Sequence, residues 1–93
     1  SEEMNYGEFL EKTKEKPDYS NIWPSPIRDA ILKMLEEKPC SREEIAAAVY
    51  GKVDKKTESK IEGVTAKLRK AGVIIRRYAN NEAYYGFASK IRQ

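Results

Sequence analysis

The chain has 93 residues, of which 40% are apolar and 35% are charged, with a net charge of +3. This length accommodates one small domain with one modest core, and the apolar fraction is typical of a globular chain. Histidine is absent, and no nucleophile, phosphate-loop or zinc-ligand pattern occurs. Because histidine is the commonest general base and metal ligand, we expect no enzyme, no metal or cofactor, and no small-molecule substrate.

No apolar run approaches the roughly 18 residues that a membrane-spanning helix requires. The single cysteine, Cys40, cannot form an internal disulfide, which is typical of a reducing compartment. We therefore expect a protein without a membrane partner, located in the cytoplasm, or in the nucleoid if its source is prokaryotic or viral. Cys40 itself is expected to be a small residue packed beside a helix start.

Residues 1–24 are predicted to form an N-terminal arm separate from the main domain. They carry six acidic and three basic residues. Met4, Phe9, Leu10 and Thr13 indicate a short helix with a weak apolar stripe, which the sequence around Pro17 should end. An aromatic connector then leads to Trp23, which we expect to lie against the core. The arm is also the candidate contact of a homodimer.

Two helices should open the main domain, residues 25–93. Ser25 followed by Pro26 is typical of a helix start, and apolar residues at steps of three and four continue to about Lys38. Ser41 and Glu44 have the spacing of a capping box, which predicts a second, short helix ending near Gly51.

A third helix should follow, with its start at either Asp54 or Thr57 and its end near Gly72. Its buried side is marked by apolar residues and one threonine: Ile61, Val64, Thr65 and Leu68. After Gly72 the pattern changes to two β-strands, residues 73–78 and 83–88, and residues 79–82 form the turn between them. The pair Asn80-Asn81 suits a hairpin turn because Asn tolerates positive φ.

The third helix and the strand after it are strongly basic. Residues 52–77 carry nine Lys or Arg and three Asp or Glu, a net +6, whereas the rest of the chain sums to −3. At about 100° per residue, Lys residues alternate with small residues on the face away from the core. Such a face allows a helix to enter a groove while the lysines reach the flanking phosphates. An ordinary solvated face, with Glu58 and Glu62 paired to neighbouring lysines, is the alternative.

The order of these elements resembles the winged helix-turn-helix family. The resemblance covers residues 25–90 through the segments IRDAILKML, SREEIAAAV, IEGVTAKLRKAGVI and IIRRYANNEAYYGF. It implies an α+β fold with a three-helix core and a C-terminal hairpin wing, to which the arm is added. It also implies that the third helix enters the major groove of DNA and that the wing contacts the backbone or the minor groove.

Double-stranded DNA is therefore the predicted partner, and a small transcriptional regulator is the predicted function. A winged helix that binds protein as a subunit of a larger assembly, using Trp23, the arm or the hairpin, is the alternative. Only one of Arg76 and Arg77 should face DNA, because consecutive strand residues point to opposite faces. The candidate DNA-contacting residues are Lys55, Lys56, Thr57, Ser59, Lys60, Gly63, Lys67, Arg76, Arg77, Asn80 and Asn81.

Overall fold

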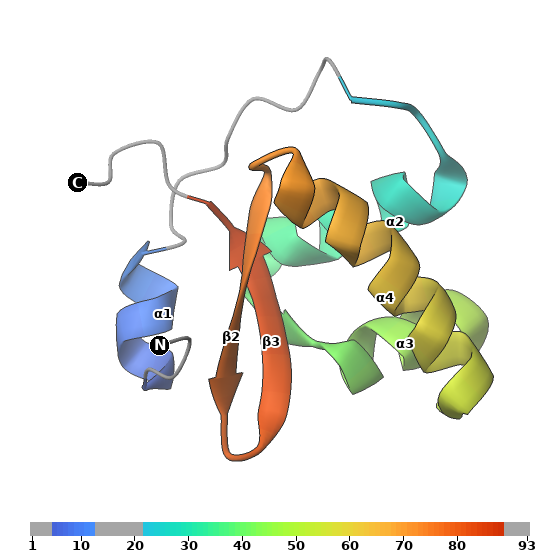
Figure 1. Cartoon of the computed structure of the whole chain (residues 1–93). Coiled ribbons are helices and arrows are strands. Elements are labelled where there is room, and N and C mark those ends of the chain that lie inside the picture. The colour runs from blue at the N-terminus through green and yellow to red at the C-terminus, as the bar shows by residue number, and fades with distance from the viewer. Residues whose placement is uncertain (1–4, 13–21, 89–93) are drawn as a thin grey trace.

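The computed structural model describes residues 5–12 and 22–88, which form an α+β fold. Within these ranges there are four helices and one three-stranded antiparallel sheet (Figure 1). In chain order the elements are α1 (Tyr6–Lys12), α2 (Pro26–Glu37), β1 (Cys40–Ser41), α3 (Arg42–Tyr50), α4 (Lys55–Lys70), β2 (Ile74–Ala79) and β3 (Glu82–Phe87). Met4, Thr13 and Pro17, on which part of the arm prediction relied, lie outside the described residues.

Local sequence explains where the three longer helices begin. The Ser25 hydroxyl accepts a hydrogen bond from the Arg28 backbone N–H at 2.9 Å, with Pro26 in the first helical position. In α3, Ser41 and Glu44 form the predicted capping box. These caps satisfy backbone donors that have no partner within the helix, and the start of α4 is capped in a similar way.

The sheet has the strand order β1-β3-β2, and both neighbouring pairs are antiparallel. β2 and β3 form the predicted hairpin, in which Arg76 lies opposite Tyr85. β1 was not predicted from the sequence, because two residues are too few to show a period; here Cys40 pairs with Tyr85. Cys40 is buried directly before the cap of α3, as expected.

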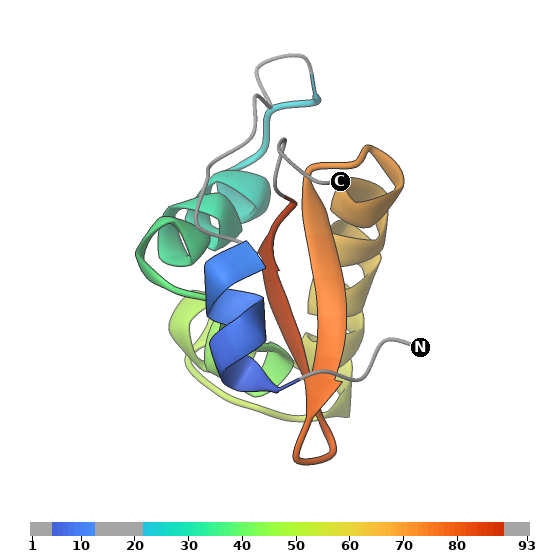
Figure 2. The ribbon, with the colours of Figure 1, turned by 90° about the vertical axis from the view of Figure 1, so that its left-hand side faces the viewer.

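The core lies between the helices α2, α3 and α4 and one face of the sheet. Figures 1 and 2 show α1 on the other side of the hairpin, away from α4. Phe9 of α1 is only 2% exposed, so this short helix buries an aromatic side chain within its own chain. Leu32 of α2 is fully buried as well. Other large side chains that are fully buried in the core are Ile31, Ile45, Ile61, Leu68, Ile74 and Tyr85.

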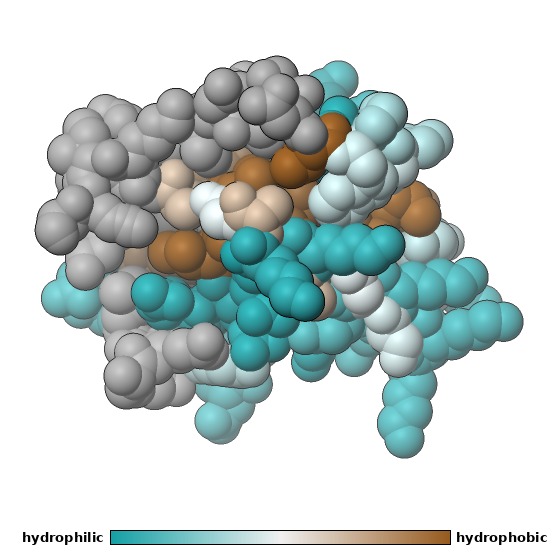
Figure 3. All heavy atoms as spheres, turned by 45° about the horizontal axis from the view of Figure 1, so that its top comes forward, coloured by the Kyte–Doolittle hydropathy of each residue, from teal (hydrophilic) through white to brown (hydrophobic). Residues whose placement is uncertain are grey.

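The remaining surface is mixed in polarity. Figure 3 shows long hydrophilic side chains projecting from the molecule, and hydrophobic atoms gathered across the middle of the face in view. Trp23 is half-buried and packs against the core, as predicted for the aromatic connector. Among the described residues, no helix has the length and apolar character needed to cross a membrane.

Candidate nucleic-acid interface

The outer side of α4 forms a continuous exposed surface, which we call the lysine face. The opposite side of the helix is held in the core by Thr57, Ile61, Thr65 and Leu68, all less than 4% exposed. That burial fixes the rotation of the helix, so the residues between these positions face outward. The lysine face consists of Lys55, Lys56, Ser59, Lys60, Gly63, Ala66, Lys67 and Lys70, all of which are exposed.

The charge of this surface has one sign. Every fully exposed charged residue of α4 is a lysine, whereas Glu58, Glu62 and Arg69 are half-buried on a different flank of the helix. The two glutamates pair with arginine side chains and not with the lysines of α4. The expected pairing of Glu58 and Glu62 with neighbouring lysines is therefore wrong, while an ordinary solvated face stays the alternative for the lysines themselves.

Two lysines of this face lie beside aromatic rings of neighbouring segments. The Lys60 ammonium is 5.3 Å from the centre of the Tyr50 ring of α3, and the Lys67 ammonium is 5.5 Å from the centre of the Trp23 ring. Both distances lie within the range of a cation–π contact. The two lysines are separated by two helical turns, roughly 10 Å at 1.5 Å per residue. Each of the two lysines is therefore held near an aromatic ring from outside α4.

The middle of the lysine face has little side-chain bulk. Ser59, Gly63 and Ala66 are exposed there, between the lysines. A Cβ atom built on Gly63 would have no neighbouring atom within 4 Å. Since Gly in a helix interior costs about 1 kcal/mol relative to Ala, the packing of the described residues gives no reason for Gly63. A partner approaching closely at this position would provide one.

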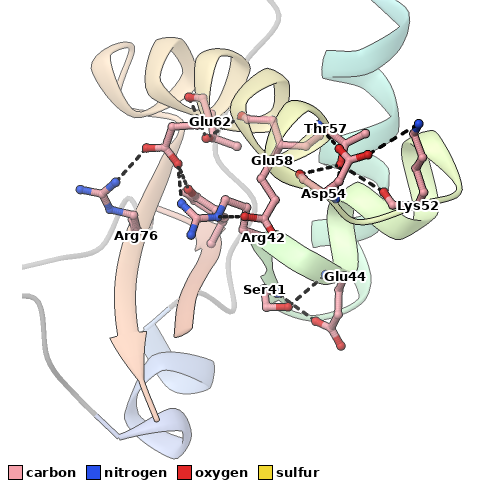
Figure 4. Close-up of polar contacts among 12 residues, drawn as sticks. Ser41, Arg42, Glu44, Lys52, Asp54, Thr57, Glu58, Glu62 and Arg76 are labelled. Carbon is pink, nitrogen blue, oxygen red and sulfur yellow. Dashed lines mark hydrogen bonds and ion pairs between the residues drawn. The ribbon is translucent and has the colours of Figure 1, made fainter. Parts of the chain in front are cut away.

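Thr57 does not belong to this surface, contrary to the prediction. Its side chain is 3% exposed, and its hydroxyl lies 3.0 Å from the Asp54 backbone N–H, from which it accepts a hydrogen bond. The Asp54 carboxylate in turn accepts from the Thr57 backbone N–H at 2.8 Å (Figure 4). The two alternative caps of the third helix are thus two halves of one reciprocal cap, with Asp54 preceding the first turn. These hydrogen bonds lower the pKa of Asp54.

A second group of charged residues surrounds Glu62 on the flank of α4 that faces α3 and the hairpin (Figure 4). We call it the Glu62 cluster. The Glu62 carboxylate accepts hydrogen bonds from Arg42 of α3 at 3.2 Å, Arg76 of β2 at 3.0 Å and the Tyr85 hydroxyl of β3 at 3.0 Å. Arg69 lies 3.5 Å away, and Glu58 is 3.9 Å from the Arg42 Nε. One carboxylate therefore connects α3, α4 and both strands of the hairpin.

The groups around Glu62 favour the ionised form of its carboxylate. Burial alone would raise the pKa of Glu62, but the hydrogen bonds from Tyr85 and Arg42 and the positive charges of Arg76 and Arg42 outweigh it and lower the pKa below its usual value. Burial and the negative charge of Glu62 raise the pKa of the Tyr85 hydroxyl. Glu62 is thus ionised at neutral pH, and Tyr85 remains a hydrogen-bond donor.

The two arginines of β2 point to opposite faces of the sheet, as the sequence predicted. Arg76 points toward α4 and into the Glu62 cluster, with 20% of its side chain exposed, and its guanidinium lies 5.4 Å from the centre of the Tyr78 ring. Arg77 is on the other face, half-buried, and donates a hydrogen bond to the Arg76 carbonyl oxygen at 2.7 Å. Neither is a freely projecting cation, so the hairpin supplies less positive surface than the sequence suggests.

Asn80 and Asn81 form the tip of the hairpin. Both are exposed and have positive φ angles of 54° and 66°. A two-residue loop with positive φ at both positions has the character of a type I′ turn, in which Asn is favoured. Backbone conformation therefore explains the residue type at both positions, while their side chains are accessible at the end of the hairpin.

The sequence predicted the lysine face but gave no sign of the Glu62 cluster. Arg42 and Tyr85 come from α3 and β3, and nothing in their spacing along the chain links them to Glu62. The described residues hold no group of three or more Cys, Asp or Glu side chains placed to bind a metal ion. In comparisons with known proteins, no family model, curated protein or solved structure matches the chain.

Proposed function

We propose that this chain is a winged helix-turn-helix protein that binds double-stranded DNA as a small transcriptional regulator. In this proposal α2, α3 and α4 are the three-helix core, α4 enters the major groove, and the hairpin β2–β3 is the wing. The observation that carries it is the lysine face, where all exposed charged residues of the helix are lysines. A surface of one sign with small residues at its centre suits a polyanion that approaches the helix closely.

The chemistry of this surface favours contacts to the DNA backbone over contacts to bases. Its charged groups are lysines, which act as point charges toward phosphate, and it contains no Arg, Asn or Gln, whose planar groups form paired hydrogen bonds with bases. With Thr57 buried, any sequence preference would rest on Ser59, Lys60 and the hairpin. We therefore expect modest sequence preference on top of strong general affinity for duplex.

Fluorescence anisotropy of a labelled random duplex, titrated with the protein at several salt concentrations, tests the proposal. Five lysines on the face give an expected slope of about −4 to −5 in a plot of log affinity against log salt, because each neutralised phosphate releases about 0.9 counterion. A dissociation constant above roughly 100 µM at low salt would be weaker than ordinary non-specific binding and would overturn the proposal.

A further inference from the structure

We propose that Glu62 withholds arginine side chains from DNA, so that the lysine face alone sets the affinity of the domain. This inference rests on the proposed function and concerns its regulation by the protein's own charges. The sequence places Arg69, Arg76 and Arg77 in the same basic block as the lysines. In the structure, two of these three arginines lie beside Glu62 and not on the lysine face.

The geometry of the Glu62 cluster supports this role. Arg42, Arg69 and Arg76 approach the carboxylate from α3, from the next turns of α4 and from β2, at 3.2, 3.5 and 3.0 Å. Their side chains are 33%, 27% and 20% exposed, although the Nε atom of each is buried. A phosphate at this flank would have to compete with Glu62 for the same donors. Positive charge is thus present there, but it is already paired.

The balance of charges explains why removal of one carboxylate should have a large effect. Three guanidinium groups lie around Glu62, and Glu58 adds a second carboxylate only at 3.9 Å from Arg42. Glu62 also repels an approaching phosphate directly. If Glu62 is neutralised, Glu58 is the only carboxylate left beside the three guanidinium groups. These groups then lie unneutralised next to α4, the helix that we place in the major groove. The Tyr85 hydroxyl lies 3.0 Å from the Glu62 carboxylate and would keep a hydrogen-bond acceptor if Gln replaced Glu.

The test compares Glu62→Gln with wild type and with Glu37→Gln. Glu37 is exposed on α2, so its replacement removes the same charge away from the cluster. We expect Glu62→Gln to bind the random duplex roughly tenfold more tightly at 50 mM salt, with a slope steeper by about 0.9, the effect of one added phosphate contact. Binding by Glu62→Gln that equals binding by Glu37→Gln, or is weaker than wild type while the circular dichroism is unchanged, would overturn the inference.

A second variant decides the question even if Glu62→Gln does not fold. Arg76→Gln in the wild-type background should change duplex affinity by less than about twofold, because Arg76 is held by Glu62 and a full phosphate contact is worth roughly tenfold at this salt concentration. In the Glu62→Gln background the same change should remove the gain. A loss of fivefold or more from Arg76→Gln alone would show that Arg76 already contacts DNA and would overturn the inference.

Retention on a heparin column separates this inference from the proposed function. Heparin is a polyanion without bases or grooves, so it detects available cations whether or not duplex DNA is the partner. Glu62→Gln should elute at higher salt than both wild type and Glu37→Gln. If duplex binding is absent while this shift is observed, the DNA proposal fails, but Glu62 still keeps the arginine side chains from polyanions. Equal elution of all three proteins overturns this role of Glu62.

Discussion

The lysine face and the Glu62 cluster lie on two flanks of the same helix and contain the same kind of charge, yet they differ in availability. On the lysine face, five lysines are exposed, and no carboxylate of α4 is exposed with them. In the Glu62 cluster, three arginines surround one carboxylate that also binds Tyr85. The comparison teaches that a count of basic residues overstates the positive charge available at the surface when some of those residues are paired with carboxylates.

Reversing the charge of the lysine face should have the largest effect. Lys60→Glu combined with Lys67→Glu removes two contacts and adds repulsion, so duplex affinity should fall by roughly a hundredfold or more at 50 mM salt. The control is Lys33→Glu combined with Lys38→Glu on and after α2, which changes the net charge equally. Because Lys38 lies 3.4 Å from Glu44 of the α3 cap, circular dichroism checks that this control keeps its fold. Anisotropy titrations measure both pairs. Equal losses for the two pairs would mean that net charge, and not the lysine face, governs binding.

Loss of one hydrogen bond in the Glu62 cluster should affect stability and not binding. Tyr85→Phe keeps the buried ring and removes the hydroxyl that donates to Glu62 at 3.0 Å. Because Glu62 is partly exposed, we expect the free energy of unfolding to fall by about 1–2 kcal/mol, toward the low end for bonds to charged groups. Urea denaturation measures this change. The salt slope of duplex binding should stay at its wild-type value; a changed slope would show that the hydroxyl helps to hold the arginines.

Gly63→Ala should separate folding from binding on the lysine face. The added methyl group has no neighbour within 4 Å, and Ala has the higher helix propensity, so the free energy of unfolding should rise by about 1 kcal/mol. If DNA approaches α4 closely at this position, duplex affinity should fall severalfold in the same variant. Thermal denaturation and anisotropy provide the two measurements. Greater stability with unchanged affinity would place the closest approach elsewhere on the helix.

Acid should weaken the Glu62 cluster. The pKa of Glu62 is lowered in the folded chain, so its contribution to stability is complete above the unfolded pKa of about 4.3 and is lost as pH falls through the folded pKa. The difference in unfolding free energy between wild type and Glu62→Gln should therefore be constant above about pH 5 and shrink below pH 4. A difference that stays constant down to pH 3 would contradict this. The same series with Glu37→Gln measures the background of the other carboxylates.

Sequence patterns predicted the elements of the fold more fully than the candidate site. Caps and steps of three and four residues located α2, α3 and α4, and Asn80-Asn81 located the hairpin, because these signals depend on neighbouring residues. β1 was missed because its two residues acquire strand geometry only by pairing with β3. Thr57 was assigned to the wrong surface because its hydroxyl is used in the cap of α4 and its side chain is buried.

The sequence by itself therefore determined which helix is basic and which of its faces carries lysine and small residues, since helical periodicity follows from order along the chain. Only the tertiary structure decided which charges remain available. Arg42 and Arg76 come from α3 and β2, and only the packing of these elements around α4 brings them to Glu62, beside Arg69 of the same helix. Electrostatic pairing depends on distance in space, and a charge of +6 counted along residues 52–77 contains no information about that distance.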